Sequence, residues 1–142
     1  MDRILLEKHL VYVADCVRLL RERAHPNEIA SDPVQFHFVV HVLQTAAQAA
    51  QDIASMIVAH RGLGEPRTNK ELFQRLAQDG WISAEDAEVW RQIIAFRNIV
   101  MHRYLQVDAT IVRHIAERRT EDLMRFVHRV RERLQELDPA SS

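Results

Sequence analysis

The eight residues from Arg97 to Tyr104 combine side chains that could act on a phosphodiester. They read Arg97-Asn98-Ile99-Val100-Met101-His102-Arg103-Tyr104, and we call them the octet. Arginine carries a permanent planar charge suited to phosphate, and histidine exchanges protons near neutral pH. The octet overlaps an apolar stretch, 89–101, that predicts a buried helix. Burying arginine and histidine costs several kcal/mol unless they are paired or used, so we expect Arg97, Asn98 and His102 to be functional.

The spacing inside the octet limits what one helix can do. At about 100° per residue, one stripe holds Trp90, Ile94, Arg97, Met101 and Tyr104. His102 lies about 140° from Arg97, although Asn98 and His102 are four residues apart and could orient each other. Arg97 and His102 would converge if the helix unwound near Met101, or if a twofold-related partner supplied a second octet. We favour a homodimer, because the helix is more apolar than so few elements can cover and twofold symmetry is the commonest.

The cleft expected between two octets would be positive, with two imidazoles, no carboxylate cluster and no metal ligands. This chemistry suits attack by a ribose 2′-hydroxyl on the adjacent phosphate. His102 would move protons, and Arg97 would stabilise the added negative charge on phosphorus. Asn98 would hold the imidazole tautomer or bind a phosphate oxygen. We therefore expect RNA to be cleaved without a metal or cofactor, and DNA to resist cleavage.

The whole chain has the composition of one soluble domain spanning residues 1–142. It is 47% hydrophobic and 27% charged, with three glycines and four prolines, which favours an all-α fold. No apolar run is long enough to cross a bilayer, and the start of the chain is too charged for a secretory signal, so we expect a cytoplasmic protein with no membrane partner. The single cysteine, Cys16, excludes an intrachain disulfide and is interpreted as a small core residue. A net charge of −1 leaves the partner undecided.

Apolar periodicity and capping signals divide the chain into helical segments. They are predicted over 2–23, 33–60, 68–80, 83–101 and, from Asp108 or Thr110, to 137. The last segment could be one helix or two broken near Arg119-Thr120, and residues 138–142 are expected to fray. The segments predict an up-down bundle of four main helices plus one short helix.

The octet also resembles a known motif. Arg97, four residues, His102, one residue and Tyr104 match the Arg-x4-His-x-Tyr motif of HEPN-domain toxins of the HepT type. The likeness covers nearly the whole chain, including Ser31-Asp32, the Ala/Gln-rich stretch 48–54, the Gly/Pro loop and the stretch 71–77. Asp52 matches an acidic position after the Ala/Gln stretch, and we rank it second because it could simply pack between helices.

The resemblance implies an α-helical HEPN homodimer with a composite, metal-independent ribonuclease site at the subunit interface. It also implies a partner, a minimal nucleotidyltransferase antitoxin (MntA-like) that neutralises the toxin. In such systems the motif tyrosine, here Tyr104, can accept AMP. Added phosphate beside Arg97 would fill the cleft and cancel its positive potential.

Other interpretations of the same residues stay open. The domain could be a non-catalytic HEPN module that binds a nucleotide or a partner protein, or a plain helical adaptor in which Arg97 pairs with Asp52 and His102 is a core histidine. His37 and His41 have metal-ligand spacing but no third ligand, so we interpret them as solvent-facing or packing residues. The basic stretch 113–133 is interrupted by acidic residues and is typical of a solvated helix face.

Overall fold

The computed structural model describes residues 1–138, which form helices joined by short loops. The α-helices are α1 (Arg3–Arg23), α2 (Pro33–Arg61), α3 (Asn69–Gln78), α4 (Ala84–His102), α5 (Ala109–Arg118) and α6 (Thr120–Leu137). Single 3₁₀ turns, η1 (Pro26–Glu28) and η2 (Tyr104–Gln106), lie in two of the connections. The all-α prediction is confirmed.

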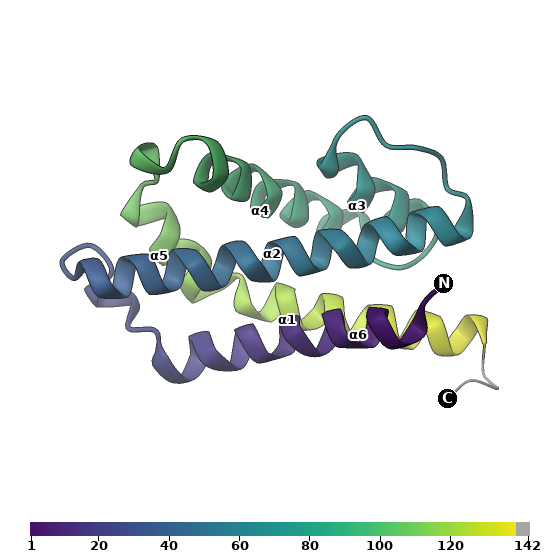
Figure 1. Ribbon diagram of the computed structural model, residues 1–142, viewed down its shortest axis with the longest axis horizontal. Coiled ribbons are helices and arrows are strands. Elements are labelled where there is room, and N and C mark those ends of the chain that lie inside the picture. The colour runs from purple at the N-terminus through teal and green to yellow at the C-terminus, as the bar shows by residue number, and fades with distance from the viewer. Residues whose placement is uncertain (139–142) are drawn as a thin grey trace.

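The four long helices run alternately up and down, so that α1 begins and α6 ends at the same end of the molecule (Figure 1). Helix α2 is central: it contacts α1 on one side and α3 and α4 on the other, while α6 packs against α1. The predicted up-down bundle is therefore confirmed. Because α2 lies against α4, its side chains decide the surroundings of the octet.

Local sequence signals start the helices where they were expected. The side chain of Asp2 accepts a hydrogen bond from the Leu5 amide, and that of Asp32 accepts one from the amide of Val34. Thr68, Ser83 and Asp108 cap α3, α4 and α5 in the same way. Such caps satisfy backbone N–H groups that the first turn leaves without partners.

The segment 109–137 is two helices rather than one, so the bundle has two short helices where one was predicted. Arg119 ends α5 and begins α6: its amide donates to the carbonyl of Ile115, and its carbonyl accepts from the amide of Leu123. The charges around this break favour two ends, because basic Arg118 closes α5 and acidic Glu121 and Asp122 open α6.

The core consists of the predicted apolar stripes. Buried leucines and valines of α1 meet the alanine-rich face of α2, where the small side chains allow close approach. Phe73 stacks on Trp90 with ring centroids 4.8 Å apart, and Phe126 lies 4.9 Å from Trp90. This cluster joins α3, α4 and α6. Cys16 is buried, as expected, and burial raises the pKa of its thiol.

A polar cluster ties the end of α2 to the loop after α3. Arg61 Nε donates to Asp79 Oδ2 over 2.9 Å, and the indole N–H of Trp81 donates to the same oxygen over 2.9 Å. The bond from Arg61 and, to a smaller extent, that from Trp81 lower the pKa of Asp79.

Two further predictions concern the chain ends and membranes. Of the segment 138–142 that was expected to fray, only Asp138 is described, and it ends α6; the rest lies outside the described residues. Among residues 1–138, no helix combines the length and the hydrophobicity needed to span a membrane.

Candidate active site between α2 and the end of α4

Helix α4 stays helical through Met101 and ends at His102. The amide of Arg103 donates to the Ile99 carbonyl over 2.7 Å, which closes the last turn. The expected alternative of unwinding near Met101 is therefore excluded. Within one chain, Arg97 and His102 consequently keep the separate directions that an intact helix imposes.

Arg97 faces α2, where Gln48 is its partner. An Nη of Arg97 donates to Oε1 of Gln48, and Nε2 of Gln48 donates to Oδ1 of Asp52 over 2.8 Å. Arg97 therefore does not pair with Asp52 directly, as one interpretation had it; Gln48 lies between them. The Nε of Arg97 is buried and has no hydrogen-bond partner in the described part of the chain. The guanidinium is thus half-buried and only partly satisfied, an arrangement that costs stability and leaves donors for a ligand.

Two further residues of the Arg97 stripe, Met101 and Tyr104, also contact α2. The side-chain amide of Gln44 lies 3.4 Å from Sδ of Met101. Beyond the end of α4, the hydroxyl of Tyr104 is hydrogen-bonded to Nδ1 of His37, and the two rings are nearly parallel, with centroids 5.7 Å apart. From Arg97 to Tyr104, the end of α4 and η2 therefore meet one stripe of α2.

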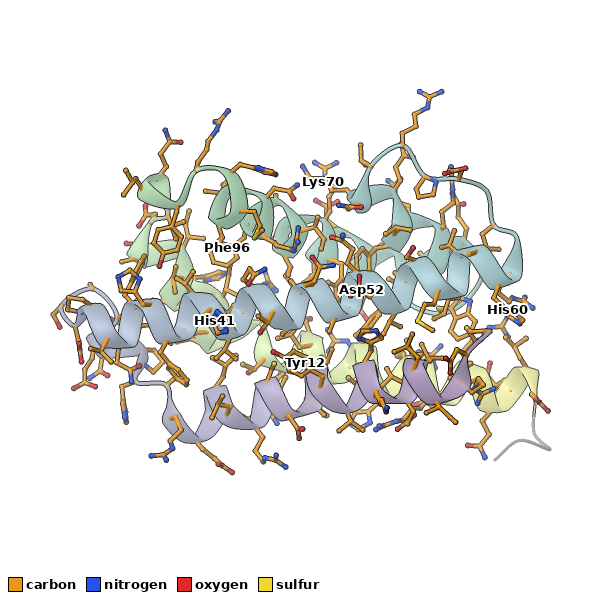
Figure 2. All side chains as sticks on the ribbon, viewed as in Figure 1. Tyr12, His41, Asp52, His60, Lys70 and Phe96 are labelled. Atoms are coloured by element: carbon orange, nitrogen blue, oxygen red, sulfur yellow. The ribbon has the colours of Figure 1, made fainter. Side chains whose placement is uncertain are left out.

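From the sequence we did not predict that the residues of α2 facing the octet form one polar stripe. It consists of polar residues at helical spacings of three and four, namely His37, His41, Gln44, Gln48 and Asp52. Figure 2 labels two members, His41 and Asp52, along α2. A polar stripe within a helix whose other faces are apolar was the available signal. His37 and His41 are exposed, as expected, but the contact between His37 and Tyr104 was not foreseen.

His102 and Asn98 lie outside these contacts. His102 is exposed and Asn98 is half-buried, and neither side chain has a hydrogen-bond partner within residues 1–138. The bond expected between these two residues is therefore not formed. The imidazole at the end of α4 is open to solvent and can meet a ligand or another chain.

An apolar groove lies on the other side of α4, between α4 and α5. Its volume is about 270 Å³, and its apolar lining includes Ile93, Phe96, Ile99, Val107, Ile111 and Ile115. Leu105 is 99% exposed beside it, and Ile99 and Ile111 are 39% and 48% exposed. On an ideal helix His102 lies about 60° from Ile99, so the imidazole stands near the edge of this groove.

Comparison with known proteins agrees with the fold and with the family that the octet resembles. Residues 10–130 match the family described as "Ribonuclease HepT-like". The "mRNA nuclease HepT" of Shewanella oneidensis is 25% identical over 128 residues, 89% of this chain and 96% of that protein. A solved structure described as a tri-AMPylated S. oneidensis HEPN toxin in complex with an MNT antitoxin has a TM-score of 0.84 and 22% identity, covering 93% of this chain and 99% of that one. The cytosolic protein YutE of Bacillus subtilis, whose function is unknown, has a TM-score of 0.88 and 14% identity over 97% of this chain and 94% of that one.

The fold and the motif together define an all-helical HEPN domain with an Arg-x4-His-x-Tyr sequence at the end of one long helix. The match spans most of the chain, so the protein belongs to the ribonuclease HepT-like family. This confirms the resemblance noted from the octet.

Proposed function

We propose that this protein is the toxin of a toxin–antitoxin pair and cleaves RNA without a metal ion. The observation that carries the proposal is the octet: a half-buried guanidinium held on α2 by one neutral partner, and an exposed imidazole with no hydrogen-bond partner in the described chain five residues further on. Its family and its S. oneidensis relative, both described as ribonucleases, support the same activity.

In this proposal the ribose 2′-hydroxyl attacks the adjacent phosphorus and the bond to the 5′ oxygen breaks. His102 takes and returns protons, and Arg97 stabilises the negative charge that develops on the phosphoryl oxygens. Asn98 binds a phosphate oxygen from the same face as His102. Gln48 and Asp52 place Arg97, because the amide of Gln48 donates to Asp52 and therefore turns its carbonyl oxygen toward the guanidinium.

We further propose that a second copy of this chain covers the groove between α4 and α5. The intact helix prevents Arg97 and His102 of one chain from converging, so a complete site needs both octets. The apolar lining of the groove includes Ile99 and Ile111, which are exposed in the single chain. Exposed apolar patches of this kind often mark protein–protein contacts. Because His102 stands near the groove edge, a twofold contact there would bring the imidazole toward the partner subunit.

Tyr104 is the proposed point of control. It is 39% exposed, beyond the last residue of α4, and therefore accessible to an antitoxin. A minimal nucleotidyltransferase would transfer AMP to its hydroxyl. The added phosphate would bring negative charge to the end of α4 and compete with RNA for Arg97. The described complex of the S. oneidensis toxin with an MNT antitoxin supports this assignment.

Replacing His102 with Ala tests the catalytic claim. In excess EDTA, the wild-type protein should cut RNA to cyclic-phosphate ends and leave a substrate with a 2′-deoxyribose at the cut site intact. H102A should lose about 10²- to 10⁴-fold in rate, the usual contribution of general acid–base catalysis. Its fold should persist, because the ring is exposed and has no hydrogen-bond partner in the described chain.

The matched control is His128→Ala, which removes an exposed histidine of α6. H128A should cut at the wild-type rate. Cleavage by H102A at the wild-type rate would refute the role of His102. Binding of RNA without any cleavage by the wild-type protein would instead support a non-catalytic module.

A further inference from the structure

The contact between Tyr104 and His37 joins a reactive hydroxyl to a base. His37 lies near the start of α2 and Tyr104 in η2, and the two residues are 67 positions apart in the chain. The Tyr104 hydroxyl is hydrogen-bonded to His37 Nδ1, and the rings lie 5.7 Å apart at an interplanar angle of 5°. Phe36 meets the Tyr104 ring edge-on at 6.4 Å. These contacts hold the Tyr104 hydroxyl against Nδ1 of His37.

A tyrosine hydroxyl needs such a base to become a nucleophile. A free phenol is almost entirely protonated at neutral pH, whereas a neutral imidazole readily accepts a proton there. Nδ1 of His37 accepts the phenolic proton when the imidazole carries its own proton on Nε2. In the described part of the chain, no other base is hydrogen-bonded to the Tyr104 hydroxyl. Both side chains are exposed, so a second protein can approach the pair.

We propose that His37 is the proton acceptor that activates Tyr104 for AMP transfer, an inference that rests on the proposed role of Tyr104. The Tyr104 oxygen forms a bond to the α-phosphorus of ATP, and the bond between that phosphorus and the bridging oxygen breaks to release pyrophosphate. The phenolic proton moves to His37 Nδ1 and is then lost to water. The toxin thereby supplies the base for its own modification, and the antitoxin supplies the bound nucleotide.

The imidazolium formed in this step also favours the reaction before its proton passes to water. It stands beside the phosphoryl group as the new bond forms, and an opposite charge at such short range stabilises the negative charge there. The same pairing does not help RNA cleavage directly, because His37 is bonded to Tyr104 and to neither Arg97, whose partner is Gln48, nor His102. Removing His37 should therefore lower the rate of AMP transfer to Tyr104 before it affects the rate of RNA cleavage.

The test compares AMP transfer to the wild-type protein with transfer to His37→Ala and His37→Asn. Each protein is mixed with its cognate nucleotidyltransferase, Mg²⁺ and ATP, and the mass increase on the Tyr104 peptide is followed with time. Both variants should be modified about 10²-fold more slowly, the lower range for loss of a general base. The asparagine amide can accept the hydrogen bond but cannot take the proton, so H37N separates proton transfer from positioning.

Added imidazole should restore part of the rate to H37A, which a purely structural role of His37 would not produce. The matched control is His128→Ala, an exposed histidine of α6 outside the polar stripe of α2, which should be modified at the wild-type rate. A wild-type rate for H37N, or no rescue of H37A by imidazole, would overturn the role of His37 and leave Tyr104 as the acceptor. If the wild-type protein gains AMP elsewhere or not at all, both this inference and the proposed role of Tyr104 are wrong.

Discussion

Replacing Arg97 with Met should separate catalysis from stability. Arg97 occupies a position on α4 where the spacing of Ile94 and Met101 predicts an apolar residue. The structure places it against α2 with one neutral partner, Gln48. An apolar side chain would therefore pack better than Arg97 at this position. We expect substitution of Arg97 to lower the rate of RNA cleavage and to leave the free energy of unfolding nearly unchanged.

The magnitude follows from three terms that nearly cancel. A hydrogen bond from a charged group contributes about 1.5–3 kcal/mol, and R97M loses the one to Gln48. The substitution also removes the buried Nε that has no partner in the described chain, a defect that costs about 1–3 kcal/mol. The methionine adds apolar burial at about 0.8 kcal/mol per methylene, and Gln48, being half-buried, can bond to water. The free energy of unfolding should stay within about 1 kcal/mol of the wild-type value.

Cleavage should fall far more. Loss of one group that stabilises developing charge costs about 10²- to 10³-fold in rate. Urea denaturation at a fixed protein concentration, read by circular dichroism, gives the stability, and initial rates on a defined RNA give the activity. The concentration is fixed because dimerisation would couple to unfolding.

Arg125→Met is the matched control with the opposite expectation. Arg125 pairs with Asp86 at 2.9 Å and with Asp122, whose side chain is only 9% exposed. In R125M, Asp122 still has an ion pair with Arg119 at 3.4 Å. The free energy of unfolding should therefore fall by about 1–2 kcal/mol rather than by the full cost of breaking a buried ion pair. R125M should cleave RNA at the wild-type rate. If R97M is destabilised by more than about 2 kcal/mol, or cleaves within tenfold of the wild-type rate, the electrostatic role of Arg97 is refuted.

Two further predictions concern the scaffold. Because the bond from Arg61 lowers the pKa of Asp79, its charged form stabilises the fold above the ordinary carboxyl pKa of about 3.9, and this contribution is lost as pH falls below it. The difference in free energy of unfolding between the wild-type protein and D79N, from urea denaturation, should therefore be constant between about pH 5 and 8 and shrink below about pH 4. A difference that stays constant down to about pH 3 would contradict this. Phe126→Ala should cost about 3–5 kcal/mol by the same method, because Phe126 is 1% exposed and packs on Trp90. A loss below about 1 kcal/mol would show that the aromatic cluster can collapse around the cavity.

Much of the helical layout could be read from local patterns. Asp32-Pro33 begins α2 and Ser83 begins α4 as predicted, because capping depends on a few adjacent residues. The octet stood out for a similar reason, since Arg97 and His102 break an apolar period within a short segment. The family could be recognised because its motif is contiguous.

A break near Arg119-Thr120 could be suggested from the sequence, but whether the helix is broken there could not be decided. Both 109–118 and 120–137 have helical patterns, and no proline or glycine separates them. Charged residues on either side are compatible with a continuous helix as well as with two ends. Only the packing of α6 on α1 and of α5 on α2 shows that the chain must turn there.

The partners of the octet are a tertiary property. Periodicity gives the angle at which Arg97 leaves α4, but it does not say which helix lies opposite or in what register. That register depends on how the alanine-rich face of α2 packs against its neighbours, and it pairs Gln48 with Arg97 and His37 with Tyr104 across 49 and 67 residues of chain. The sequence thus predicted the chemical groups of the site, whereas helix packing determined their hydrogen-bond partners.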